Sequence, residues 1–355
     1  MGFELLADID AKRVFESTRR FEDLDLFHVP FDELTGRAVT EDVLLKTVAA
    51  DGKIALLGGS GGGKSSVLSF ALGPYSVDIP DHLVPIRIPV AAEGQGLVTD
   101  ANAFARYVLG RCTKWASVDL LTEGERRSLE AANAKRIKRF SERKTRKFSL
   151  ATPGWLADLG FAREVAEAGT ELERDVTASD AVDALGTLVS IFHSHGLSPF
   201  FVIDDSDAWL TVPGVGDRTG LANDFFLNAL QLLIREIDCG FAATVHNEYL
   251  DLAGYRQIRG MLSREIEIPD LGDRAGEAIA KILARRLDYF ELNATPTDVF
   301  TEDGITGLEW HYHSDPRRSL RDVLRVADRA VQHACSGQQD VVTKELVILT
   351  VAELR

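Results

Sequence analysis

The residues best suited to chemistry form a glycine-rich stretch, Gly58 to Ser65, directly after the apolar run 54–57. Its spacing, G-x-x-x-x-G-K-[ST], is typical of a loop that binds phosphate groups. Glycines let successive backbone N–H groups point at phosphate oxygens, and the positive end of the following helix strengthens that site. The pattern predicts that Lys64 reaches the β- and γ-phosphates of a nucleotide and that Ser65 binds Mg²⁺. The candidate nucleotide-binding residues are Gly58, Gly59, Ser60, Gly61, Gly62, Gly63, Lys64, Ser65 and Ser66.

Two acids, Asp204 and Asp205, follow the apolar run Phe-Phe-Val-Ile at 200–203. Such a run is typical of a buried parallel strand whose C-terminal end opens on a phosphate site. We predict that Asp204 holds Mg²⁺, directly or through water, and that Asp205 polarises the attacking water. Asn247 closes a second buried-type run and is expected to hold that water or touch the γ-phosphate. For the glycine-rich stretch 58–65, a plain surface loop is the simpler alternative, but it leaves the pair Lys64 and Ser65 unexplained.

Five apolar runs alternate with helix-type segments, which predicts an α/β fold with a doubly wound parallel sheet. The predicted strands are 54–57, 83–90, 200–203, 241–245 and 266–268. Prolines at 85 and 89 favour a place at the sheet edge for the second strand, because proline cannot donate to a neighbouring strand. Apolar residues at helical spacing predict helices at 39–48, 102–111, 180–195 and 223–238.

From residue 273 onward the pattern changes to helices only. They are predicted at 274–290, 304–313, 316–334 and 343–354. Pro316 suits the first turn of the third of these helices, with Ser314 or Asp315 as its cap. This part of the chain is small and follows the sheet closely, so we expect it to lie over the nucleotide as a lid.

The predicted elements divide the chain into three parts. Residues 1–50 form an N-terminal segment that we expect to cover the nucleotide base, 51–272 form the α/β domain, and 273–355 form the helical lid domain. The alternative for the helix at 39–48 is that it simply packs on the domain. Between the predicted helices at 102–111 and 180–195 the chain becomes strongly basic and then helical at about 155–170. We therefore predict a basic helical insertion at about 112–178.

Composition limits the class of protein. The chain has 355 residues and a formal net charge of −15, so its surface as a whole repels nucleic acids and anionic membranes. Its three cysteines show no pairing or metal-ligand spacing, which fits a reduced interior. No apolar stretch approaches the length of a membrane span. We expect a cytoplasmic protein that does not enter a membrane.

One segment, 125–147, is positively charged, whereas the chain as a whole is negatively charged. It holds ten Lys or Arg residues, from Arg126 to Lys147, against three Glu, and its net charge of +7 leaves −22 for the rest of the chain. Clustered basic residues of this kind contact the phosphate backbone of DNA or RNA. The alternative is a solvated helix or a loop that docks on an acidic neighbour, such as another copy of this chain.

With both phosphate motifs placed, the chain resembles an AAA+ ATPase, a P-loop NTPase with a helical lid. It is most similar to the origin-recognition and replication-initiator branch and its bacterial transposon-regulator relatives. Residues 58–65 match the Walker A motif, 200–205 the Walker B motif, and Asn247 the sensor-1 position. The resemblance covers nearly the whole chain.

Two arginines acquire roles through this resemblance. Residues 314–320, Ser-Asp-Pro-Arg-Arg-Ser-Leu, are similar to the Gly-Asp-Ala-Arg-Arg-Ala-Leu pattern of the lid, which makes Arg317 the sensor-2 arginine that reaches the γ-phosphate. Arg264 resembles the arginine finger that one subunit offers to the nucleotide of the next. Arg256 and Arg259 lie close to it in the sequence.

The chain also departs from the family pattern. Asp205 stands where the family has a glutamate, so hydrolysis is expected to be slow or the protein to act mainly as a nucleotide-gated switch. No winged-helix domain follows the lid in this sequence, so direct sequence-specific reading of DNA is not expected.

The resemblance implies an ATPase that binds ATP and Mg²⁺ at a subunit interface, assembles into a homo-oligomer and couples its nucleotide state to a protein or DNA partner. Two alternatives stay open. One is a STAND-type signalling switch that holds nucleotide in a monomer until a trigger arrives. The other is a nucleic-acid remodeller whose basic insertion grips DNA or RNA.

Overall fold

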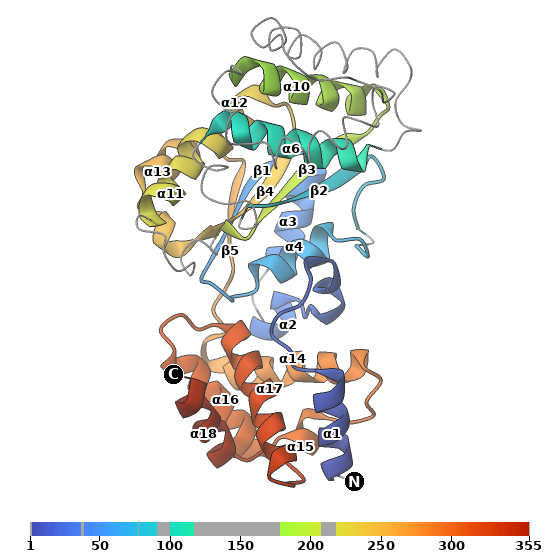
Figure 1. Cartoon of the computed structure of the whole chain (residues 1–355), viewed down its shortest axis with the longest axis vertical. Coiled ribbons are helices and arrows are strands. Elements are labelled where there is room, and N and C mark those ends of the chain that lie inside the picture. Colours follow the sequence, from blue (N-terminus) through green and yellow to red (C-terminus); the bar gives the residue numbers. More distant parts are fainter. Residues whose placement is uncertain are drawn as a thin grey trace, which may run out of the picture.

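The computed structural model describes residues 2–36, 39–76, 78–90, 100–116, 178–206 and 218–354. The basic segment 125–147 and most of the predicted insertion lie outside these residues. Figure 1 shows an α/β body above a body made of helices only, with α1 (Gly2–Lys12) and α18 (Lys344–Leu354) both in the helical body.

The α/β body contains a five-stranded parallel sheet in the order β2-β3-β4-β1-β5, which confirms the predicted sheet. Its strands are β1 Lys53–Gly58, β2 Leu83–Pro89, β3 Ser198–Asp204, β4 Gly240–His246 and β5 Arg264–Glu267. β2 lies at the sheet edge, as its prolines predict. The carbonyls of Arg87 and Pro89 on this strand accept hydrogen bonds from Arg111 and Tyr107.

Helices cover both faces of the sheet, so its central strands are apolar throughout. One face packs on α3 (Thr40–Ala49) and α4 (Lys64–Leu72). The other face is covered by the remaining helices of this body: α6 Ala101–Trp115, α10 Ala178–Ser194, α11 Arg218–Asp224, the π-helical turn η5 Phe225–Leu230, α12 Gln231–Glu236 and α13 Ala253–Arg259. The predicted helices at 102–111, 180–195 and 223–238 are confirmed.

In the α/β body, a short 3₁₀ turn, η6 (Asn247–Tyr249), follows β4. A second 3₁₀ turn, η7 (Gly272–Arg274), leads into the helical body. Besides α1 and α18, that body contains α14 Ala275–Tyr289, α15 Pro296–Val299, α16 Glu302–Ser314 and α17 Leu320–Ser336. The prediction that α17 starts near Pro316 was wrong. Arg318 has a left-handed backbone (φ 47°), which a right-handed helix does not contain, and Ser319 caps the helix by accepting from the Asp322 N–H at 3.1 Å.

The N-terminal segment joins the two bodies. α1 packs on α17, and Leu6 and Ile9 share a core with the helical body. Two 3₁₀ turns, η1 Phe21–Asp23 and η2 Asp25–Phe27, and the short helix α2 Phe31–Thr35 then lead toward α4. Between these parts the buried guanidinium of Arg286, on α14, donates to the carbonyls of Val14 and Glu16.

Candidate nucleotide-binding site

The glycine-rich loop lies between the end of β1 and the start of α4. Gly61 (φ 72°) and Gly63 (φ 108°) adopt left-handed backbones that residues with side chains rarely adopt. The first bond within α4 runs from the Val67 N–H to the Gly63 carbonyl at 3.0 Å. The N–H groups of residues 64–66 therefore have no partner within the helix, and they lie at its positive end.

Lys64, the first residue of α4, is only 4% exposed. Its ammonium group donates to the carbonyls of Gly58 and Gly59, at 3.0 and 2.8 Å. The side chain thus turns back over its own loop, and its charge stays next to the backbone that a phosphate group would meet.

The structure brings Ser65 and Asp204 together. Ser65 Oγ donates to Asp204 Oδ1 at 3.0 Å, and Asp204 is 1% exposed. Burial, and then the neighbouring charge of Asp205, raise the pKa of the Asp204 carboxyl to about 6. Asp204 Oδ2 is buried and has no hydrogen-bond partner among the described residues. The Arg87 guanidinium forms a long ion pair with this oxygen, at 3.9 Å. A carboxylate oxygen without a hydrogen bond, beside a hydroxyl, fits Mg²⁺, which prefers oxygen ligands and keeps several waters.

Asp205 lies next to this pair, and one nitrogen of the Arg87 guanidinium forms ion pairs with both Asp204 and Asp205. Its backbone is left-handed (φ 65°), and its carboxylate pairs with the Arg87 guanidinium at 3.3 Å. Arg87, on β2, also pairs with Glu22 at 3.3 Å and stacks over Phe21 at 4.4 Å from the ring centroid. The sequence analysis missed Arg87, and the available signal was one charged residue within the apolar run 83–90.

Asn247 follows the last residue of β4 and is exposed. The register of the sheet pairs His246 on β4 with Gly58 at the end of β1. Because the carboxyl ends of parallel strands share one edge of a sheet, Asn247 lies at the edge that carries the glycine-rich loop.

Arg317 lies on the loop that leads into α17, and this loop contacts the glycine-rich loop. A Cβ atom at Gly59 would lie 3.3 Å from the Arg317 carbonyl. The Arg317 guanidinium, however, pairs with Asp315 at 3.2 Å and Asp322 at 2.9 Å. Arg321, which the sequence analysis did not single out, donates its backbone N–H to the Gly61 carbonyl at 3.2 Å.

Arg264 is the first residue of β5, and the register pairs it with Ile54 near the start of β1. About 13 Å of strand therefore separates Arg264 from the end of β1 where the loop begins. Its side chain is exposed and forms no ion pair with another described residue. Its two neighbours do: Arg256 pairs with Asp251 at 2.9 Å and Arg259 with Glu265 at 2.8 Å.

A cavity of about 130 Å³ adjoins the glycine-rich loop. It lies between that loop, the N-terminal segment and the lid. Its lining residues include Val29, Phe31, Gly63, Lys64, Ser66, Ile282, Leu320 and Arg321. Arg286 closes the lid side, and burial lowers the pKa of its guanidinium to about 10. Apolar walls beside a phosphate-type loop suit a flat aromatic base.

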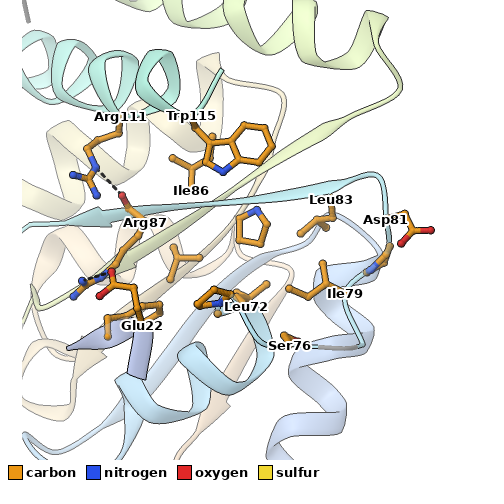
Figure 2. A pocket seen from close by; sticks show the side chains of 16 residues that line it. Glu22, Leu72, Ser76, Ile79, Asp81, Leu83, Ile86, Arg87, Arg111 and Trp115 are labelled. Carbon is orange, nitrogen blue, oxygen red and sulfur yellow. Dashed lines mark hydrogen bonds and ion pairs between the residues drawn. The ribbon is translucent and has the colours of Figure 1, made fainter. Parts of the chain in front are cut away.

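A larger cavity, of about 640 Å³, runs along the edge strand β2 (Figure 2). Leu72, Ile79 and Leu83 form part of its apolar lining, and Arg111 and Trp115 border it from α6. It contains none of the site residues predicted from the sequence. It meets the site only through Arg87, which extends from this cavity to Asp205.

The parallel sheet, the loop between β1 and α4 and the helical lid define a P-loop NTPase fold of the AAA+ type. The chain resembles solved structures of origin-recognition proteins from Aeropyrum pernix. The ORC2 protein in its ADP form matches 96% of this chain and 72% of its own length, with a TM-score of 0.50 and 12% identity, and this match shows a shared fold. The ORC1 protein in complex with DNA matches 92% of this chain, with a TM-score of 0.48 and 13% identity. This chain spans 66% of that ORC1 chain. No family model and no curated protein matches the sequence.

Proposed function

We propose that this chain is an AAA+ ATPase that binds ATP with Mg²⁺ and hydrolyses it. The observation that carries the proposal is the contact of 3.0 Å between Ser65 Oγ and the buried Asp204 carboxylate. This contact lies at the mouth of a loop in which Gly61 and Gly63 have left-handed backbones. The ORC2 protein that shares the fold was solved in an ADP form.

Each group near the loop has a proposed part. Ser65 and Asp204 hold the metal, and the N–H groups in the first turn of α4, at the positive end of the helix, bind phosphate oxygens. When bound, Mg²⁺ neutralises charge on the β- and γ-phosphate oxygens. Lys64 gives up its hydrogen bonds to the carbonyls of Gly58 and Gly59 and binds the β- and γ-phosphate oxygens instead. Asp205 and Asn247 orient the attacking water, with Asp205 restrained by Arg87.

We further propose that the active unit is a homo-oligomer. Arg264 is too far from the glycine-rich loop of its own chain to reach a nucleotide there, and it has no described acidic partner. It is therefore free to approach the nucleotide of an adjacent copy. Arg317 completes the site from within the chain once it leaves Asp315 and Asp322. The nucleotide state would then govern assembly and contact with a protein or DNA partner.

Dependence of turnover on protein concentration tests the interface. A site completed by a second copy gives a specific ATPase rate that rises with concentration until the oligomer is saturated. Activity that stays proportional to concentration from nanomolar to micromolar contradicts the shared site.

Asp204→Asn should abolish Mg²⁺-dependent turnover, and turnover that persists in this variant contradicts the metal assignment.

A second candidate, a STAND-type switch with slow or no turnover, draws support from Asp205. This carboxylate is one methylene shorter than glutamate and is held by Arg87 at 3.3 Å. Such a switch would purify as a monomer with tightly bound ADP. Exchange of the bound nucleotide within minutes, in an oligomeric preparation, argues against it.

Contact with DNA is proposed only from the basic segment 126–147, which lies outside the described residues. Phosphate contacts weaken as salt rises. DNA binding that survives charge reversal of Arg136, Lys138, Arg139 and Lys144 would remove this segment from the proposal. We also propose a cytoplasmic location, and within the described residues no helix is long and apolar enough to cross a membrane.

A further inference from the structure

A buried histidine lies beside the glycine-rich loop and belongs to no part of the proposed reaction. The His28 side chain is 2% exposed. Its Nδ1 lies 2.9 Å from Ser66 Oγ, and its Nε2 lies 3.1 Å from Glu41 Oε1. Its ring packs against Phe70 with centroids 4.7 Å apart. The N-terminal segment, α3 and α4 thus meet at one imidazole.

The network fixes the direction of these hydrogen bonds. Glu41 Oε1 also accepts the Phe31 N–H at 3.0 Å. Burial acts to raise the pKa of Glu41, but hydrogen bonds from His28 and Phe31 outweigh it and lower that pKa, so the carboxylate is ionised and accepts. His28 Nε2 therefore carries a proton. In the neutral ring Nδ1 is then the acceptor, and the Ser66 hydroxyl donates to it.

Ser66 belongs to the first turn of α4, whose N–H groups have no partner within the helix. A helix end of this kind frays unless something holds it. Ser66 also lines the cavity beside the loop, as do His28 and Phe31. Phe31 lies close to the loop, since a Cβ atom at Gly63 would be 3.2 Å from its ring.

Ser69, one turn further along α4, provides an internal comparison. Its hydroxyl donates to the Phe21 carbonyl at 2.6 Å and accepts the Asp25 N–H at 3.1 Å. It therefore also ties α4 to the N-terminal segment, and it is fully buried. Unlike Ser66, it does not line the cavity.

We propose that His28 is a positioning residue for nucleotide binding: by holding Ser66, it fixes the first turn of α4 and thereby aims the backbone N–H groups of residues 64–66 at the phosphates. The inference rests on the proposed function, because it assumes that nucleotide binds at this loop. An N–H group that is already oriented does not have to be ordered when the ligand arrives, and the affinity is higher for that reason.

Four variants test this inference through the dissociation constants of ADP and ATP and the thermal midpoint. Ser66→Ala and His28→Gln remove the bond to Nδ1 and are expected to weaken both nucleotides by about 3- to 10-fold, the effect of one hydrogen bond. His28→Asn places an amide oxygen near the position of Nδ1, and so should recover most of the affinity. Ser69→Ala should lower the thermal midpoint but leave both dissociation constants within about 2-fold of wild type.

Combining Ser66→Ala with His28→Gln gives a second measure. The two changes remove the same bond, so the double variant should bind no more weakly than either single variant. The inference is overturned if Ser66→Ala and His28→Gln bind like wild type, if Ser69→Ala weakens binding as much as they do, or if the single losses add. A wild-type protein that binds no nucleotide overturns the proposed function itself.

Discussion

Ser65 donates a hydrogen bond of 3.0 Å to Asp204, although 139 positions separate them in the chain. The bond satisfies one oxygen of the carboxylate, while the buried Oδ2 has no hydrogen-bond partner among the described residues. The Arg87 guanidinium approaches this oxygen only to 3.9 Å. An ionised carboxylate in this state costs stability unless a closer cation or a proton reaches it. The feature that suits the site for a metal ion therefore destabilises the protein when no ligand is bound.

Without nucleotide and Mg²⁺, the stability contributed by Asp204 should fall as the pH rises. Its folded-state pKa of about 6 exceeds the ordinary value of 3.8, so the native state binds this proton more tightly than the unfolded state does. The contribution is fully present below about pH 4 and is lost as the pH rises through about 6, with an upper limit of about 3 kcal/mol.

Urea unfolding of wild type and Asp204→Asn at pH 5 and 7.5 measures this effect. The variant cannot ionise at this position, so it should lose less stability between the two pH values and equal or exceed wild type at pH 7.5. Other acids with a raised pKa, such as the partly buried Asp25 and Asp328, titrate in both proteins and cancel in the difference. Equal pH dependence in the two proteins contradicts the raised pKa.

The second prediction concerns Arg87, whose guanidinium pairs with Asp205 at 3.3 Å. Arg87→Met keeps the side-chain stem but removes this pair, so Asp205 can turn toward the attacking water. It also removes the longer contact of Arg87 with Asp204, at 3.9 Å. Losing one such contact changes a rate by about 3- to 10-fold, and we expect turnover to increase by this factor at an unchanged KM. Glu22→Gln is the matched control, because it removes one carboxylate partner of Arg87 and leaves its pairs with Asp205 and Asp204. Slower turnover in Arg87→Met contradicts the restraint.

Much of the fold could be predicted because its signals are local. Continuous apolar runs identified β1, β3 and β4, and alternate apolar positions identified β2 and β5. The prolines of β2 identified an edge strand. The start of α17 was misplaced because Pro316 suits the first turn of a helix, whereas the left-handed backbone of Arg318 delays that helix to Leu320. Nothing in the sequence indicates that an arginine such as Arg318 has a left-handed backbone.

The site was only partly predictable, for a related reason. Lys64, Ser65 and Asp204 belong to motifs whose spacing reflects a shared task. His28 and Glu41 have no such spacing relative to Ser66, because each comes from a separate segment and they meet only through tertiary packing. No sequence pattern records a contact of that kind.

The third prediction tests Arg264 as a group supplied to another copy. Arg264→Ala should slow turnover by about 10³-fold or more, the usual contribution of an arginine finger, with nucleotide affinity nearly unchanged. Arg256→Ala is the control, because this nearby arginine is also exposed but already pairs with Asp251.

Mixing inactive proteins makes the test specific for a shared site. Lys64→Ala lacks a working loop but keeps Arg264, while Arg264→Ala keeps its loop. In a mixture, Lys64→Ala can supply the arginine to the loop of Arg264→Ala, so activity should reappear. A mixture that stays inactive, although the two proteins are shown to co-assemble, would place Arg264 outside the reaction.

The last prediction separates the two arginines at the start of the lid. Arg317 is held by Asp315 and Asp322, whereas Arg321 lines the cavity and bonds the glycine-rich loop through its backbone. If Arg317 reaches the γ-phosphate, Arg317→Ala weakens ATP by about 10- to 100-fold, the effect of a charged hydrogen bond, and spares ADP. Arg321→Ala should weaken both nucleotides, since Arg321 lines the cavity beside the loop. Titrating each variant with ADP and a non-hydrolysable ATP analogue measures both effects, and a reversed pattern would assign the γ-phosphate contact to Arg321.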